Sequence, residues 1–318
     1  MGDGRWAMGD GRWAMGEDDS ACQTHPQLLP LSYAGNMSHT APTHMPVTGG
    51  MPLTKSALGV FATLASGELL LLRHVVGIGL NYAAHAHEQG KPAPERPVLF
   101  SKNTLACALN GDTIVIPKIC QDKQQVDFET ELAVVLGTAP ANVGTGAPLA
   151  NLLGQPNGLP NGLAHGSGAK LIKDVSEADA LSCVLGYCVA NDVSARWWQK
   201  DGSGGQFYRG KSFDSFCPLG PFLTPAANVP NPQALRLFAR LNGVEMQNSS
   251  TSDMIFSVAR LIAEMSRGTS LLPGTVILTG TPSGVGFART PQVFMKPGDT
   301  IEVEVESLGV LSNLVADE

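Results

Sequence analysis

Charged residues are scarce in this chain of 318 residues: Asp, Glu, Lys and Arg make up only 15% of it, against a norm of roughly 25%. The formal net charge is −7, which argues against nucleic acids and anionic membranes as partners, because both need basic patches. Long apolar runs are also missing. The longest are interrupted by Arg73 and His74, and none approaches the ~20 residues that cross a bilayer. We therefore expect neither a nucleic-acid partner nor a membrane partner.

The six cysteines form no CxxC pair and no dense framework. Most lie inside apolar runs, where a cysteine behaves as a small buried hydrophobe. The amino-terminal region shows no apolar core of a signal peptide. These absences predict reduced thiols and a cytoplasmic protein. A mitochondrial location stays open, because acidic residues near the start weaken a transit-peptide interpretation without excluding it.

Two segments predict little ordered structure. Residues 1–56 begin with Met-Gly-Asp-Gly-Arg-Trp-Ala twice in succession, and this repeat has neither a helical nor a strand period. We expect residues 1–56 to be a low-complexity, disordered tail and residues 57–318 to be the folded domain. Within that domain, residues 137–173 are rich in Gly, Pro, Asn and Ala. We interpret them as a mobile surface insertion.

The remaining pattern is typical of many short strands. Period-two runs recur from residue 58 to residue 315, whereas the only clear helical patterns cover residues 81–89 and 252–267. Glycine (36 residues) and proline (22 residues) are frequent, which suits a chain with many turns. We therefore predict a β-rich α+β fold with a rolled sheet and few helices, in preference to a doubly wound fold.

An acidic strand is the most informative single stretch. In residues 126–136, apolar and small side chains alternate with Asp127, Glu129 and Glu131, so the three acids share one face. Three carboxylates side by side repel one another unless a positive group offsets them, and carboxylate oxygens suit magnesium, manganese or calcium. A solvated edge strand with an acidic outer face would show the same alternation. These residues alone leave both interpretations open.

Five motifs together give the chain a resemblance. They are Gly79-Leu-Asn-Tyr82 with His85 and Glu88, Asp127-Phe-Glu-Thr-Glu131, Asn191-Asp-Val-Ser-Ala-Arg196, Gly210-Lys-Ser-Phe-Asp214 with Cys217-Pro218, and Leu278-Thr-Gly-Thr-Pro-Ser-Gly-Val-Gly286. In this order the sequence resembles the fumarylacetoacetate hydrolase family, and within it the smaller fumarylacetoacetate hydrolase domain-containing proteins. The resemblance implies a rolled mixed β-sheet or β-barrel core and a catalytic domain over residues 57–318.

The resemblance also implies a metal site and a substrate class. Family members bind Mg²⁺ or Mn²⁺ through positions that correspond to Glu129, Glu131 and Asp192, and a structural Ca²⁺ site is the alternative for these three acids. The absence of histidine and thiolate among them argues against zinc. The family's substrates are small 2-oxo acids, handled through an enolate that the metal stabilises. The reaction is then hydrolysis of acylpyruvates, decarboxylation of oxaloacetate, or keto–enol tautomerisation.

Roles for further residues follow by position. His85 and Glu88 lie one helical turn apart, so the carboxylate can orient an imidazole that moves protons. Lys211 is expected to stabilise a carboxylate or a developing oxyanion. The expected substrate-binding residues are Tyr82, Arg196, Gln199, Gly280 and Thr281.

Two departures from the family pattern bear on activity. Ala84 and Trp197 stand where family members commonly have Asp. They motivate an alternative in which the chain is a non-catalytic metal- or metabolite-binding protein of the same fold. Family members are commonly homodimers, and we expect the same here.

Overall fold

The computed structural model describes residues 49–148 and 170–318. Its strands are β1 (Met51–Ser56), β2 (Gly59–Thr63), β3 (Leu69–Leu71), β4 (His74–Gly79), β5 (Val98–Lys102), β6 (Cys107–Leu109), β7 (Ile114–Ile116), β8 (Val126–Asp127), β9 (Thr130–Leu136), β10 (Val184–Asn191), β11 (Ser194–Ala195), β12 (Cys217–Pro225), β13 (Arg236–Leu241), β14 (Val244–Ser250), β15 (Thr275–Leu278), β16 (Thr300–Val305) and β17 (Gly309–Asp317). The α-helices are α1 (Ala83–Glu88), α2 (Lys118–Gln121), α3 (Arg196–Gln199), α4 (Phe207–Lys211) and α5 (Val258–Ser266). None of these described helices is long and apolar enough to cross a membrane.

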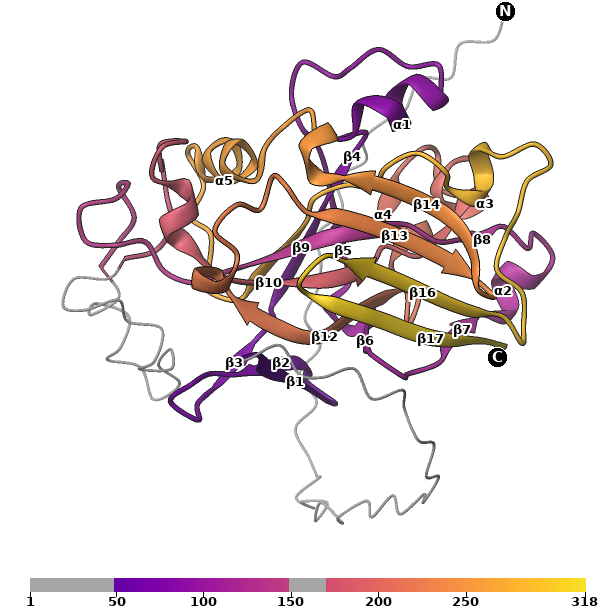
Figure 1. Ribbon diagram of the computed structural model, residues 1–318, viewed down its shortest axis with the longest axis horizontal. Coiled ribbons are helices and arrows are strands. Elements are labelled where there is room, and N and C mark those ends of the chain that lie inside the picture. The colour runs from indigo at the N-terminus through magenta and orange to yellow at the C-terminus, as the bar shows by residue number, and fades with distance from the viewer. Residues whose placement is uncertain (1–48, 149–169) are drawn as a thin grey trace, which may run out of the picture. The chain divides into compact units, whose positions relative to one another are not determined.

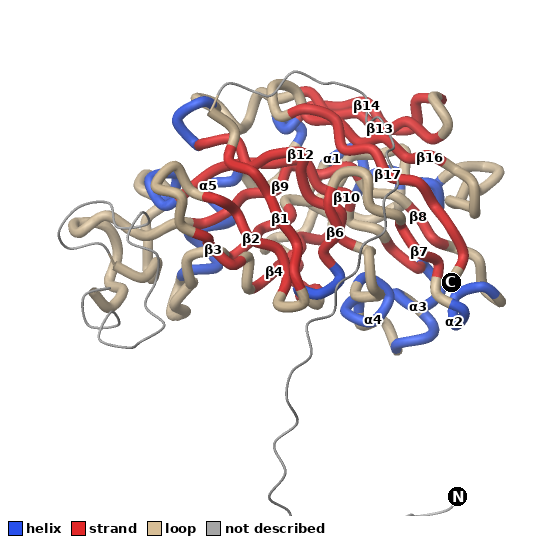
Figure 2. Tube along the Cα trace, turned by 90° about the horizontal axis from the view of Figure 1, so that it is seen from below, coloured by secondary structure: helices blue, strands red, loops and turns tan. Residues whose placement is uncertain are grey.

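The strands form two large sheets and one small pairing (Figure 1). The larger sheet has the order β3-β2-β1-β12-β10-β9-β15-β4-β5, with β6 parallel to β12. The second sheet has the order β14-β13-β16-β17-β7, and β8 pairs with β11. The prediction of a β-rich α+β fold with a rolled sheet and few helices is confirmed. The short helices α2, α3 and α4 gather near β7 and β8 (Figure 2).

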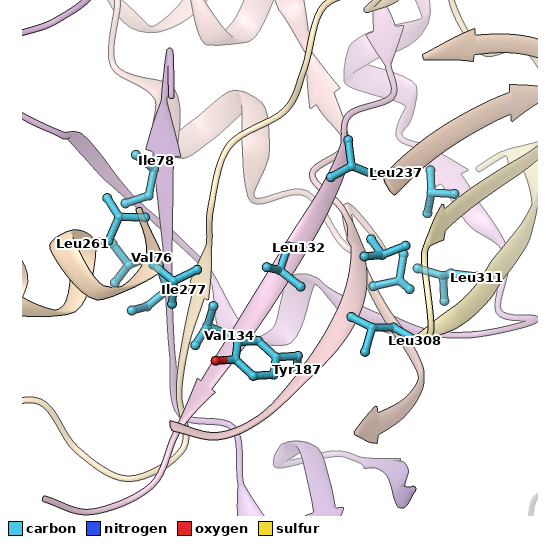
Figure 3. Packing of buried hydrophobic residues seen from close by; sticks show 14 of the residues in the cluster. Val76, Ile78, Leu132, Val134, Tyr187, Leu237, Leu261, Ile277, Leu308 and Leu311 are labelled. Atoms are coloured by element: carbon cyan, nitrogen blue, oxygen red, sulfur yellow. The ribbon is translucent and has the colours of Figure 1, made fainter. Parts of the chain in front are cut away.

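Strand β9 is central because it pairs with β10 on one side and β15 on the other. Both of its faces are buried. Leu132, Val134 and Leu136 belong to one hydrophobic cluster, and Ala133 and Val135 belong to a second. In Figure 3, Val134 lies between Ile277 of β15 and Tyr187 of β10, and Leu132 lies farther along β9. Strand β9 therefore holds the residues at its amino-terminal end in a fixed position.

Helix α5 is shorter than the pattern predicts. Ser257 caps it, because its hydroxyl accepts a hydrogen bond from the Arg260 N–H at 3.1 Å. Residues Thr251–Asp253 form a separate 3₁₀ turn, so the helix predicted over residues 252–267 begins later than expected. The apolar stripe itself is confirmed as core: Leu261 faces Val76 and Ile78 of β4 in Figure 3.

Two boundaries differ from the sequence prediction. Residues 51–56, assigned to the tail, form β1 and pair with β2 and β12. The flanks of the predicted insertion at 137–173 are also ordered: Ala139 and Ile172 belong to the hydrophobic core, and Lys170 bridges to Ala139. Both corrections have the same physical cause. Contacts with residues distant in the sequence order these segments, although their own composition does not predict ordered structure. Residues 1–48 and 149–169, the rest of these two predictions, lie outside the described residues.

Candidate active site

Three carboxylates meet where the ends of two neighbouring strands coincide. Glu131 lies at the amino-terminal end of β9, Glu129 immediately precedes that strand, and Asp192 follows the carboxyl end of β10. Because β9 and β10 run antiparallel with Thr130 opposite Asn191, these ends are adjacent. One oxygen of each acid comes within 4.8 Å of the others, and all three residues are buried. The acidic face is therefore a buried cluster and not a solvated edge.

Two lysines and an arginine surround this acidic cluster. The Nζ of Lys211 lies 2.8 Å from Oε2 of Glu129 and 2.6 Å from Oδ2 of Asp192. Lys102 donates to the other Asp192 oxygen. The Nη1 of Arg196 lies 2.7 Å from Oε1 of Glu129. All three cationic side chains are themselves buried, so these ion pairs compensate for lost hydration on both sides.

Glu131 differs from the other two acids. Its Oε2 accepts the Gly280 N–H at 2.7 Å, and within the described ranges no lysine or arginine is in ion-pair contact with it. Burial, and then the charges of Asp192 and Glu129, raise the pKa of Glu131 well above its ordinary value. Burial also raises the pKa of Glu129, but the adjacent Lys211 and its other cationic partner outweigh burial and lower that pKa. Of the three acids, Glu131 therefore experiences the repulsion that is least compensated by a cation.

The acidic cluster fits a hard divalent cation. Its donors are carboxylate oxygens, which magnesium and manganese prefer, and it contains none of the imidazole and thiolate donors typical of zinc. A divalent ion beside Glu131 would offset a buried charge that the described cations leave without a contact. Lys211 bridges the other two acids, so its ammonium would share them with the ion. The three acids therefore remain the residues that would hold the expected metal.

Close backbone packing places Lys211 and Arg196 beside the acidic cluster. Helices α3 and α4 pack directly against each other. A Cβ at Gly210 would lie 2.4 Å from the Gln199 N and 2.8 Å from the Ala195 O. Only glycine permits this approach, and Lys211 is the next residue. The Gly-Lys pair of the fourth motif thus has a steric reason.

His85 on α1 is held in one tautomer. Its Nδ1 lies 3.0 Å from Oε2 of Glu88, and its Nε2 lies 2.7 Å from Nε2 of Gln89. Because a carboxylate only accepts, Nδ1 carries the proton, and in the neutral ring Nε2 accepts from the Gln89 amide. Oε1 of Glu88 accepts the Gly284 N–H at 2.9 Å. Burial raises the pKa of Glu88, but the hydrogen bonds from His85 and Gly284 outweigh it, so this pKa is lowered.

A cavity of about 710 Å³ opens beside the acidic cluster. Of the predicted site residues, it is lined by His85, Glu129, Arg196, Gln199, Lys211 and Thr281. Glu88, Glu131 and Asp192 do not line it. Glu88 contacts His85 and Asp192 contacts Lys211, and both of these partners do line the cavity. The structure thus brings the predicted base, the predicted lysine and one predicted metal ligand to a single cavity.

Two residues predicted to bind substrate are not part of the cavity wall. Tyr82 is completely buried, bridges to Met254 through the backbone, and has no hydroxyl partner in the described part of the chain. Gly280 has φ +96° and lies against Asn81, where a Cβ would be only 2.8 Å from the Asn81 Cβ. Its N–H is already used by Glu131. Neither residue lines the cavity, so their contact with a substrate stays a prediction.

Sequence reasoning missed Lys102 and Gln247. Lys102 ends a predicted strand, where a lysine is usually solvated, and only the curl of the sheet brings it to Asp192. Gln247 lies on β14, accepts the Thr130 N–H at 2.9 Å and donates to the Thr281 hydroxyl at 2.8 Å. It therefore joins the second sheet to the cavity wall. No local pattern distinguishes either residue.

Asp127 was expected to be a neighbour of the metal ligands, and it holds Arg196 in place. Its Oδ2 lies 2.8 Å from the Arg196 Nε and 2.7 Å from Nη2. Its oxygens also accept the N–H groups of Gly286 and Phe287, at 2.8 and 2.9 Å. One buried acid thus fixes both the arginine and the loop after β15.

Comparison with known proteins agrees with this geometry. The family model described as fumarylacetoacetate (FAA) hydrolase C-terminal matches residues 74–150 and 168–316. A Bos taurus protein named oxaloacetate tautomerase FAHD2A, mitochondrial, is 41% identical over 241 residues, covering 76% of this chain and 66% of the relative. The chain thus spans just under two thirds of that relative. A putative hydrolase of Burkholderia ambifaria is 42% identical over 235 residues, covering 74% of this chain and 71% of that protein.

Solved structures show the same fold. A fumarylacetoacetate hydrolase from Exiguobacterium antarcticum is 34% identical and superposes with a TM-score of 0.61, covering 79% of each chain. A 5-carboxymethyl-2-hydroxymuconate delta-isomerase from Mycobacterium smegmatis is 31% identical with a TM-score of 0.60, covering 84% of this chain and 94% of that one. With the family model matching most of the folded region, this chain belongs to the fumarylacetoacetate hydrolase family.

Proposed function

We propose that the chain is an enzyme that moves a proton between carbon and oxygen in a small 2-oxo acid, and that it interconverts the keto and enol forms of oxaloacetate. The observation that carries this proposal is the fixed His85 tautomer. The ring lines a cavity that also presents Lys211, Arg196 and Glu129, and its acceptor nitrogen Nε2 is hydrogen-bonded to Gln89, which lines the same cavity. Relatives named oxaloacetate tautomerase and delta-isomerase support the choice, because both names describe proton shifts.

The proposed reaction assigns a task to each group. His85 Nε2 leaves the Gln89 amide and takes a proton from C3 of oxaloacetate, and the C–H bond electrons become the C2–C3 double bond of the enolate. The imidazolium then returns that proton to the C2 oxygen, which gives the enol. Glu88 stabilises the imidazolium through Nδ1, while Lys211 and Arg196 offer positive charge to the C1 carboxylate and the developing oxyanion.

A Mg²⁺ or Mn²⁺ ion held by Glu129, Glu131 and Asp192 would supply further positive charge to the 2-oxo group. The test uses the purified chain with oxaloacetate, with MgCl₂ and with EDTA, and follows the ultraviolet absorbance of the enol. Parallel assays for pyruvate release and for acetylpyruvate cleavage measure decarboxylation and C–C hydrolysis. Enol–keto exchange that EDTA slows is the expected result. If none of these activities depends on the divalent cation, the proposal is wrong.

A non-catalytic metal- or metabolite-binding role is the second candidate, motivated by Ala84 and Trp197. The Ala84 N–H donates a hydrogen bond to Asp253 Oδ2 at 3.2 Å. An acid from another segment therefore lies at this end of α1. The second, Trp197, packs edge-on against Trp198. Neither departure removes a group assigned to proton transfer. Binding of 2-oxo acids without turnover would favour this candidate.

We also propose a mitochondrial location, in place of the cytoplasmic one expected from the sequence, because several vertebrate relatives carry "mitochondrial" in their names. Cell fractionation tests it. The homodimer remains a proposal. Strand β5 ends the larger sheet and exposes Val98 and Leu99, and an apolar edge strand favours pairing. Light scattering at the mass of a single chain would exclude it.

A further inference from the structure

A second group of positive charges lies in the cavity away from the acidic cluster. Lys91 and Lys200 both line the cavity, and both residues are exposed, so they mark its mouth. The Nζ of Lys200 lies 3.3 Å from the centroid of the Phe287 ring. Such a contact attracts a cation, and among residues 49–148 and 170–318 no oxygen accepts any of its three N–H donors. Lys200 therefore presents an available cation to the cavity.

The backbone fixes the position of Lys200. Its N–H donates to the Arg196 O at 3.1 Å and to the Trp197 O at 3.2 Å, and its carbonyl accepts the Gly205 N–H at 2.7 Å. Gly204 and Gly205, with φ of +58° and +82°, make the tight turn that closes this loop. The lysine thus begins its side chain from a constrained point at the end of α3.

Charges of both signs surround Lys200. Burial, and then Arg196 and Lys91, lower the pKa of Lys200, while Asp201 and Asp127 act in the opposite direction. Asp127 and Arg196 bind each other, so their charges offset one another and leave Lys91 and Lys200 as an excess of positive charge. Of the carboxylates named, only Asp201 remains at the mouth of the cavity. An additional negative charge beside Lys200 would relieve this excess.

We propose that Lys200 binds the second carboxylate of the substrate, so that the cavity selects 2-oxo acids with a negative charge at the end remote from the 2-oxo group. This inference rests on the proposed function. The 2-oxo end is directed to the acidic cluster, Lys211 and Arg196. Ile78, Phe100 and Phe207 also line the cavity, and this apolar surface suits the carbon chain of a diacid.

The test compares two ligands that differ only in the remote charge: oxaloacetate and its 4-methyl ester, both with MgCl₂ present. For Lys200→Gln we expect the KM of oxaloacetate to rise about tenfold, with kcat changed little, because one charge-assisted hydrogen bond is lost in binding. The KM of the ester should stay within about twofold of the unmodified protein. Lys200→Arg should restore most of the preference for the diacid.

Lys123→Gln is the matched control, since it removes an exposed lysine that does not line the cavity. It should leave both KM values unchanged. If Lys200→Gln raises the KM of diacid and ester equally, Lys200 acts only through its contact with Phe287, and the inference is wrong. If the unmodified chain turns over neither ligand, the proposed function fails on its own. Calorimetric titration of the unmodified protein and of Lys200→Gln with malate and its 4-methyl ester then decides. If the substitution weakens binding of malate but not of the ester, the inference is supported. If it changes the two affinities equally, the inference is overturned.

Discussion

Replacing Glu131 by glutamine should stabilise the protein when no divalent cation is present. Glu131 lies among the acidic residues Glu129 and Asp192 and lacks a cation in direct contact within the described chain. Glutamine keeps the shape and an oxygen that can accept the Gly280 N–H, but it removes the charge. The substitution therefore isolates the repulsion among the carboxylates from packing effects.

The magnitude follows from the spacing of the acids. The ligand oxygens of the three acids lie within 4.8 Å of one another, and two carboxylate charges at that limit repel by about 3.5 kcal/mol at an effective dielectric constant of about 20. Glu131 experiences two such repulsions, from Asp192 and Glu129, and an attraction from Lys211 that offsets about one of them. Part of this repulsion is already relieved in the unmodified protein. We therefore expect Glu131→Gln to raise the free energy of unfolding by about 2–3 kcal/mol. For a domain of this size that is a rise in Tm of about 5–10 °C.

The assay is thermal unfolding in EDTA and in MgCl₂. In EDTA, Glu131→Gln should unfold at a higher temperature than the unmodified protein. Added MgCl₂ should raise the Tm of the unmodified protein by mass action and raise that of the variant less, because one ligand has lost its charge. A lower Tm of Glu131→Gln in EDTA would refute the electrostatic reasoning.

The control is the same substitution at Glu129, two residues away in the same acidic cluster. Glu129 lies 2.8 Å from Lys211 and 2.7 Å from Arg196, so neutralising it leaves two buried cations with fewer partners. Such a loss costs about 3–5 kcal/mol. Glu129→Gln should therefore lower the Tm in EDTA. Opposite signs for two equivalent substitutions would be difficult to attribute to general loss of packing.

Three further predictions concern the groups around the cavity. His85→Gln should lower kcat of the tautomerase reaction by about 10²–10⁴-fold, as for other general acid–base residues, while binding of malate measured by calorimetry persists. Glu88 has a lowered pKa, so its contribution to stability is present above its ordinary value of 4.5 and is lost as the pH falls through the lowered value. The unmodified protein should therefore be more stable than Glu88→Gln at neutral pH, and this difference in the free energy of unfolding should vanish in acid unfolding below about pH 4. A difference that grows toward low pH would contradict the assignment. Lys102→Met should destabilise the protein by about 3–5 kcal/mol in urea unfolding, because buried Asp192 loses one of its two cations, and a neutral effect would show that Lys211 alone suffices.

The sequence alone was enough to name most of the side chains that the structure brings together at this site. Period-two alternation fixed the strand that carries Glu129 and Glu131, and the order of five motifs pointed to Asp192, His85 and Lys211. The alternation and the helical spacing can be recognised in the sequence because side-chain direction in a strand and spacing in a helix are local properties. The β-rich fold follows from the same local periods, as do the apolar stripe of α5 and most strand positions.

Tertiary structure alone decided how those groups act. Whether the acidic face meets water or forms a buried cluster depends on β10 and β15 flanking β9, and no local pattern specifies strand neighbours. Lys102 reaches Asp192 only because the sheet curls. Long-range pairing also orders residues 51–56, whose composition predicts a tail. Charge and burial act over distances in space, and the chain encodes those distances only through its complete fold.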